Sequence, residues 1–392
     1  MTEPRDIRER LRSPRDLCAQ LGLLEGPPGR KWARQMRDGV FVLCPWHSER
    51  TPSCSVTTGP DGTVRAVCHA CGETGDAIGL VAAVHGIDLQ RSFREALAEA
   101  AVLAGVRLDD PTYRPRQLPV RPPPPPEPPP LDSDTFDAMA RWLLAKCPLV
   151  AAPDVARYLN DRRLGKLALH EGWGALPADP GALEGLRQGA IALFGADAWA
   201  RSGLAVRDGR RAGQWAWSSH RLVIPWRTRE GIATLQRRVL GEPPHGVGKY
   251  IFASGRSPSL PYGVEDTGEQ LEGRPMAVFV EGAVDVLAMR ALCAAEGKPA
   301  LVYGLPGVSA WRAGRGLAWA ELARGKVAVI ALDIDASGTA SEAVERAAAQ
   351  MIADLGAAGA VRVDRWRPAK GKDWAEVWRA GRPVVQGRRV AA

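Results

Sequence analysis

Residues 276–289 read MAVFVEGAVDVLAM, a short apolar run followed by Glu281-Gly282 and a second apolar stretch. Three more apolar runs follow: ALVYG (300–304), VAVIAL (327–332) and AVRV (360–363). Helical segments separate them, as in TASEAVERAAAQMIADLG. Continuous apolar strands that alternate with helices predict a parallel sheet covered on both faces. We therefore expect an α/β domain over residues 276–392.

Acidic residues follow two of these predicted strands. Glu281 ends the first run, and Asp333 and Asp335 follow VAVIAL. Because the carboxyl ends of parallel strands meet at one edge, where open α/β folds bind ligands, we expect these three side chains to gather. Crowded carboxylates repel one another unless a divalent cation neutralises them. The pattern predicts a magnesium ion bound at this edge of the sheet.

Two more acids are candidates for the same site. Asp285 lies four residues beyond Glu281 on the following helix and can reach the same place. Asp373, in GKDWAEVW, follows the fourth run. Either acid could instead be a helix N-cap, and that alternative stays open.

Four of the seven cysteines lie between residues 44 and 71. A Cys-x2-His pair and a later Cys-x2-Cys pair supply three thiolates and one imidazole, which predicts a closed, structural zinc site formed by Cys44, His47, Cys68 and Cys71. We expect Cys54 and His69 not to bind the metal. A disulfide framework is the weaker interpretation, and the remaining cysteines fit buried free thiols: Cys18, Cys147 and Cys293.

Short strands and helices surround the predicted zinc ligands. VFVLC (40–44) and TVRAVC (63–68) have strand character, with a turn at PDG (60–62) between neighbouring strands. Two helices are expected after the second cysteine pair, one over AIGLVAAVHG and one opened by a capping box at Ser92 and Glu95. A small zinc ribbon is the predicted fold.

Proline marks the clearest boundary in the chain. RPPPPPEPPP (121–130) predicts an extended linker. Between this linker and the parallel sheet, helical patterns over 136–147 and 153–162 precede strand patterns over 220–227 and 231–241, which indicates an α+β domain. The predicted organisation is multidomain α/β and α+β, with a zinc module over 1–110, a linker over 111–133, a basic subdomain over 134–275 and the parallel sheet over 276–392.

Composition restricts the class of protein. The net charge of +8 suits an anionic partner such as nucleic acid or a nucleotide. The sequence contains no uninterrupted apolar run long enough to span a membrane and no signal-peptide pattern, so we expect a cytoplasmic protein without membrane contact. GVGKY (246–250) lacks the spacing of a nucleotide-binding P-loop.

Three segments carry a family resemblance. CPWHSERTPSCSV (44–56), CHACGETGDAIGLVAAVHGID (68–88) and SFREALAEAAVLAGV (92–106) together resemble the zinc-binding domain of bacterial and phage DnaG-type primases. Cys54 stands where that family usually has an aromatic residue. Glu281-Gly282 together with Asp333-Ile334-Asp335 resembles the Toprim domain of primases, topoisomerases and some nucleases.

The central region resembles the basic polymerase subdomain of the same family. The resemblance lies in HRLVIPWRTREGIATLQRRVLG and GKYIFASG. It implies that Arg238 and Lys249, and also Arg221 and Arg237, contact nucleotide phosphates or template. Arg237 could instead be a solvated surface arginine.

The resemblance as a whole implies a DNA primase, which synthesises short RNA primers on single-stranded DNA from nucleoside triphosphates. Zinc would be structural and magnesium or manganese catalytic, and a replicative helicase is a candidate partner. Two alternatives remain open: a Toprim nuclease, and a non-catalytic DNA-binding replication protein. A phage or plasmid origin fits GLPGV (304–308) and KDW (372–374).

Overall fold

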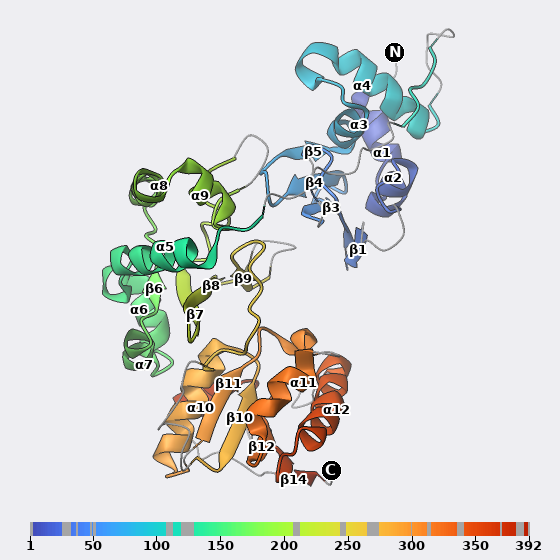
Figure 1. Cartoon of the computed structure of the whole chain (residues 1–392). Coiled ribbons are helices and arrows are strands. Elements are labelled where there is room, and N and C mark those ends of the chain that lie inside the picture. The colour runs from blue at the N-terminus through green and yellow to red at the C-terminus, as the bar shows by residue number, and fades with distance from the viewer. Residues whose placement is uncertain are drawn as a thin grey trace. The chain divides into compact units, whose positions relative to one another are not determined.

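The computed structural model divides into two compact units (Figure 1). It describes residues 3–25, 33–36, 38–47, 49, 52–106, 113–118, 129–206, 212–243, 248–264, 274–298, 300–311, 315–334, 341–368, 371–381 and 388–390. The first unit comprises Met1–Pro130, Gly195–Ala216 and Pro243–Gly248. The second comprises Leu131–Phe194, Trp217–Glu242 and Lys249–Ala392. The domain limits drawn from the sequence stay a prediction.

A five-stranded antiparallel sheet forms the centre of the first unit. Its strands follow chain order: β1 (Ala33–Met36), β2 (Gly39–Val42), β3 (Cys54–Thr58), β4 (Val64–Cys68) and β5 (Thr74–Asp76). The two strands predicted from the sequence are β2 and β4, and the predicted turn joins β3 to β4, where Gly62 adopts a φ of 75°. The sequence did not single out β3, which lies between them.

Helices pack on this sheet around one apolar core. They are α1 (Pro4–Arg10), α2 (Pro14–Gln20), α3 (Ala77–His85) and α4 (Leu89–Leu103), and α9 (Ala196–Arg201) belongs to the same unit. The sequence predicts a helix that opens at a Ser92 capping box; α4 consists of two helical stretches, and Ser92 is the non-helical residue between them. Asp88, four residues before Ser92, caps the first stretch by accepting a hydrogen bond from the Gln90 amide, and Ser92 forms a kink with φ −133° and ψ 37°.

The segment after α4 is tied back onto that helix. The buried carboxylate of Glu99 accepts hydrogen bonds from the Tyr113 hydroxyl at 2.6 Å and from the Arg116 amide at 2.8 Å. Residues 113–118, which the sequence placed in the linker, therefore contact the zinc module. Most of the proline run lies outside the described residues.

The second unit begins with helices and an antiparallel sheet. The helices are α5 (Ser133–Lys146), the 3-10 turn η1 (Leu149–Ala151), α6 (Pro153–Asn160), α7 (Gly165–His170) and α8 (Pro180–Phe194). The sheet order is β6 (Gly174–Ala175), β7 (Leu222–Thr228), β8 (Gly231–Arg238), β9 (Tyr250–Phe252). The predicted mixture of helix and strand in this region is confirmed.

A mostly parallel sheet completes the second unit. Its order is β11 (Ala300–Gly304), β10 (Met276–Val280), β12 (Val327–Ile330), β13 (Arg362–Arg365), β14 (Arg388–Val390), and only β14 runs antiparallel to its neighbour. Two helices, α10 (Ala283–Ala295) and α13 (Trp374–Arg379), join the apolar cluster on one face. Two others, α11 (Arg315–Ala320) and α12 (Glu342–Ala357), join the cluster on the other face (Figure 1). The predicted C-terminal parallel sheet with both faces covered is confirmed.

The two sheets of the second unit share one apolar core. Trp226 of β7 and Val280 of β10 belong to the same buried cluster. A polar network reinforces the junction, because the Tyr262 hydroxyl accepts from Trp173 Nε1 at 2.9 Å and donates to Glu171 at 3.0 Å. Arg290 of α10 donates to the same Glu171 at 2.9 Å. These contacts join α10 and the segment around Tyr262 to the segment after α7. Among the described residues, no helix has the length and apolar character needed to cross a membrane.

Candidate active site and metal centre

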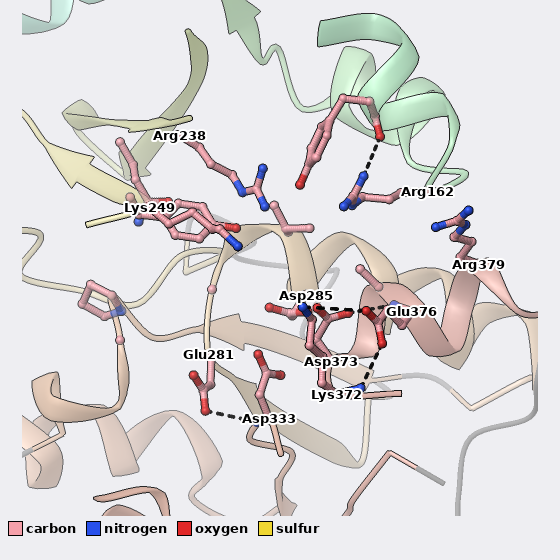
Figure 2. A pocket seen from close by; sticks show the side chains of 18 of the residues that line it. Arg162, Arg238, Lys249, Glu281, Asp285, Asp333, Lys372, Asp373, Glu376 and Arg379 are labelled. Carbon is pink, nitrogen blue, oxygen red and sulfur yellow. Dashed lines mark hydrogen bonds and ion pairs between the residues drawn. The ribbon is translucent and has the colours of Figure 1, made fainter. Parts of the chain in front are cut away.

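A pocket of about 490 Å³ lies in the second unit, lined by residues of β8 and β9, by residues that follow β10, β11 and β12, and by residues of the helices α6, α10 and α13. Figure 2 shows its labelled side chains in two groups: five acids, Glu281, Asp285, Asp333, Asp373 and Glu376, lie on one side with Lys372 beside them, and four cations, Arg162, Arg238, Lys249 and Arg379, lie on the other. We call the first group the acidic floor and the second the basic roof.

The acidic floor contains four of the predicted catalytic acids. Glu281 follows β10, and its Oε1 accepts a hydrogen bond from the Asp333 amide at 3.1 Å. Asp285 lies in the first turn of α10 and is buried. Asp373 lines the pocket and also caps α13, where it accepts from the Glu376 amide at 2.8 Å, so both interpretations of this residue apply. Asp335 lies outside the described residues.

Crowding changes the acidity of the floor. Burial, together with the charges of Asp373 and Glu281, raises the pKa of Asp285 to about 8. Burial and the charges of Asp285 and Glu281 also raise the pKa of Asp333. Asp333 Oδ1 is buried without a hydrogen-bond partner among the described residues. A buried, unpaired carboxylate oxygen among other acids fits a hard divalent cation, which prefers oxygen ligands.

Two of the predicted basic residues line the roof. Arg238 ends β8, and Lys249 precedes β9. Arg162, in the turn after α6, and Arg379, the last residue of α13, complete it, and sequence reasoning missed both. The local sequence around Arg162 does not indicate that it lines the pocket, because only tertiary packing brings the turn after α6 close to the acids.

The structure does not bring Arg221 and Arg237 to this pocket. The Arg221 guanidinium donates to both carboxylate oxygens of Asp154 and to the Leu176 carbonyl. Side chains alternate along a strand, so Arg237 points away from the face of β8 that carries Arg238. Arg237 is fully buried, and burial lowers its pKa to about 10, so the alternative of a solvated surface arginine is wrong.

The four predicted zinc ligands converge in the first unit. Their ligand atoms, from Cys44, His47, Cys68 and Cys71, all lie within 4.8 Å of one another. Two of the separations, Cys44 Sγ to Cys71 Sγ and Cys68 Sγ to His47 Nδ1, are 3.8 Å. Zinc–sulfur bonds of about 2.3 Å in a tetrahedron place two sulfurs roughly 3.8 Å apart, so the donor set fits structural zinc. All seven cysteines are free of disulfides.

Glu49 supports this centre, and the sequence interpretation overlooked it. Its Oε1 accepts from the Cys44 amide at 2.6 Å and from the Ser53 amide at 3.0 Å. Its Oε2 lies 3.2 Å from His47 Nε2, the ring nitrogen that does not face the sulfurs. A carboxylate in this place fixes the orientation of a metal-binding imidazole.

The two residues expected not to bind the metal lie outside the cluster. Cys54 is buried on β3 directly opposite Cys68 but contributes no ligand atom to the group of four. His69 Nε2 lies 2.8 Å from the Ser55 hydroxyl, and its ring stacks on Phe41 with centroids 5.7 Å apart.

Comparison with known proteins gives a family match within the first unit and relatives for the chain. Residues 31–114 match the family of the CHC2 zinc finger, the zinc ribbon of DnaG. A DNA primase of Pseudomonas putida is 27% identical over 284 residues, covering 70% of this chain and 40% of that protein. A DNA primase of Myxococcus xanthus is 26% identical over 273 residues, covering 67% and 39%. The chain is thus similar to bacterial DNA primases and spans about two fifths of the length of these curated relatives.

A solved structure is also similar. The crystal structure of the Aquifex aeolicus primase, containing its zinc-binding and RNA polymerase domains, aligns with a TM-score of 0.48 at 20% sequence identity. The alignment covers 96% of this chain and 82% of that chain.

Proposed function

We propose that this protein is a DNA primase that synthesises short RNA primers on a single-stranded DNA template. The observation that carries the proposal is the pocket of the second unit, with its acidic floor and basic roof. The same chain carries a CHC2 zinc finger and is similar to proteins named DNA primase.

The acidic floor would hold the catalytic cation. Glu281, Asp333, Asp285 and Asp373 supply carboxylate oxygens to one pocket, and Asp335 is a further candidate ligand. Bound magnesium or manganese would supply charge neutralisation for the nucleotide phosphates and activation of the attacking hydroxyl.

The chain's own groups would orient the substrates. The 3′ hydroxyl of one nucleotide attacks the α-phosphorus of the next and gives up its proton to water. The new P–O bond forms as the bond to the β-phosphate oxygen breaks, and pyrophosphate leaves with its electron pair. Arg238, Lys249 and the other roof cations stabilise the negative charge on the phosphates. No covalent enzyme intermediate is required.

The zinc module would bind the template. Its compact ribbon, closed by four ligands, is a rigid support for polar and basic groups that contact single-stranded DNA. We also propose a replicative helicase as a partner, on the basis of the family resemblance alone.

Two alternatives are separated from this proposal by one assay. The protein is incubated with single-stranded DNA, labelled ribonucleotides and magnesium. New short RNA supports a primase, whereas shortened DNA supports a nuclease that uses the same carboxylates to hydrolyse the strand. Absence of both supports a DNA-binding protein without catalysis, and either of these last two results would overturn the proposal. Asp333→Ala is the control. If this variant still synthesised primers at the rate of the parent protein, Asp333 would have no catalytic role.

A further inference from the structure

The basic roof contains a stack of alternating arginine and tyrosine side chains. Two guanidinium groups lie over the Tyr158 ring of α6, with Arg162 at 3.8 Å and Arg238 at 4.5 Å from the ring centroid. Arg238 also lies 5.2 Å from the centroid of Tyr250. Each arginine–ring contact is attractive, more so when water is excluded. Tyr158 therefore couples the positions of two cations that are distant in the sequence.

The turn that carries Arg162 is fixed from two directions. The Arg162 guanidinium donates to the Tyr158 carbonyl at 3.2 Å. Arg163 adopts a left-handed conformation with φ 57°, and its carbonyl accepts from Trp378 Nε1 at 3.1 Å. This backbone conformation is costly for a residue other than glycine. The contact with α13 holds it, so the position of Arg162 over the pocket is built into the fold.

Two polar groups of the stack lack hydrogen-bond partners in the part of the chain that the structure describes. The Tyr158 hydroxyl and Arg238 Nε are buried and have no hydrogen-bond partner among the described residues. Both side chains line the pocket with the carboxylates. Buried polar groups are almost always paired, so unpaired ones in a pocket point to a ligand that completes them. Two guanidinium groups and a hydroxyl call for an anion with several acceptor oxygens.

We propose that Tyr158 is a positioning residue that holds Arg162 and Arg238 for the triphosphate of the incoming nucleoside triphosphate. This inference rests on the proposed function and assigns the stack to one substrate of that reaction. A triphosphate concentrates its charge and can contact the roof while its other oxygens face the acidic floor. A template strand carries one charge per nucleotide along an extended path, so it places fewer phosphate oxygens near two clustered guanidinium groups. The pocket volume of about 490 Å³ suits a nucleotide-sized ligand.

The test separates the ring from the hydroxyl. Tyr158→Leu removes the stack, and Tyr158→Phe removes only the hydroxyl. Binding of ATP, of AMP and of a fluorescein-labelled single-stranded oligonucleotide is measured with magnesium on the full chain. We expect Tyr158→Leu to weaken ATP binding about tenfold, because both cation–ring contacts are lost. Tyr158→Phe keeps both contacts and loses only the hydroxyl, so it should weaken ATP binding about threefold. AMP and oligonucleotide affinities should stay within about twofold of the starting values.

A matched control is available in the same unit. Arg256 stacks on Phe136 at 3.9 Å in a pair whose residues do not line the pocket. Phe136→Leu removes a comparable stack and should leave ATP affinity unchanged in the folded protein. In primer synthesis, Tyr158→Leu should raise the KM for nucleotides about tenfold with kcat changed less than about threefold.

Three outcomes would overturn the inference. They are a loss of oligonucleotide binding with unchanged ATP affinity, an equal loss for ATP and AMP, and a variant that binds every probe like the parent. If the parent protein makes no primers yet loses ATP binding on Tyr158→Leu, the proposed function fails while the phosphate assignment stands. The two failures are thus distinguishable.

Discussion

The Glu281 carboxylate accepts a hydrogen bond from the Asp333 amide at 3.1 Å, which joins the ends of two neighbouring parallel strands. This contact fixes one oxygen of Glu281, whereas Asp333 Oδ1 lies buried without a described partner. The backbone therefore holds one acid so that the other faces the pocket. A cation held here would relieve the repulsion that raises the pKa of Asp333.

Asp333→Asn should separate catalysis from folding. We expect the rate of nucleotide incorporation to fall at least about 100-fold, because a ligand of the catalytic cation is lost. In metal-free protein the thermal midpoint should stay equal or rise, since one buried, crowded charge is removed. Magnesium should raise the midpoint of the parent but not of the variant, as measured by calorimetry. An unchanged magnesium effect in the variant would contradict the assignment.

Asp285 should make the stability of the metal-free protein depend on pH. Its pKa is about 8 in the folded state and near the ordinary value of 3.8 when unfolded. The folded state thus holds its proton where the unfolded state has lost it. Stability from this group is fully present below about pH 4 and is lost as pH rises toward 8, by at most about 1.4 kcal/mol per pH unit.

Denaturant unfolding in the presence of EDTA between pH 5 and pH 8 measures this dependence. Asp285→Asn should flatten the slope over that range, whereas Asp134→Asn, at an acid in the first turn of α5, should not. Equal slopes of the unfolding free energy against pH in the parent and in Asp285→Asn would show that Asp285 is ionised in the folded protein. That result would contradict the prediction.

Local sequence patterns predicted those parts of the fold that depend on them. The apolar runs of β10, β11 and β12 are buried on both faces, so their hydrophobicity is continuous and easily recognised. The zinc ligands follow a fixed short spacing within each pair, and the four ligand atoms converge as two such pairs around one ion require. The strand β3 was overlooked because its sequence, CSVTT, carries little apolar signal.

The basic roof depends on long-range packing and could not be predicted in this way. Arg237 and Arg238 are adjacent in sequence, yet one is enclosed on the far face of β8 while the other lines the pocket. Deciding between them requires the register of β8 against its neighbours. Arg162 reaches the pocket only through the turn held by Trp378 of α13, more than two hundred residues later.

Glu49→Gln should weaken zinc binding without changing a ligand. The neutral amide keeps the size of the side chain but loses the charge beside His47 Nε2. We expect the zinc dissociation constant to rise roughly 10- to 100-fold, as for other partners of metal-binding histidines. Competition with a chromogenic chelator measures it, with Asp61→Asn on the β3–β4 turn as the control from the same unit. Unchanged affinity would mean that Glu49 acts only by accepting hydrogen bonds from the Cys44 and Ser53 amides.

Arg221→Met and Arg238→Met should differ in what they impair. Arg221 pairs with Asp154 at the start of α6 and binds the Leu176 carbonyl, so its loss should lower the free energy of unfolding by about 1 kcal/mol and leave ATP affinity within about twofold. Arg238 lines the pocket and contacts two tyrosine rings, so its loss should weaken ATP binding at least about tenfold. Denaturant unfolding and ATP titration, carried out on both variants, check the two halves. If Arg221→Met weakened ATP binding as much as Arg238→Met, the phosphate site would have to extend beyond the pocket to the Asp154 ion pair.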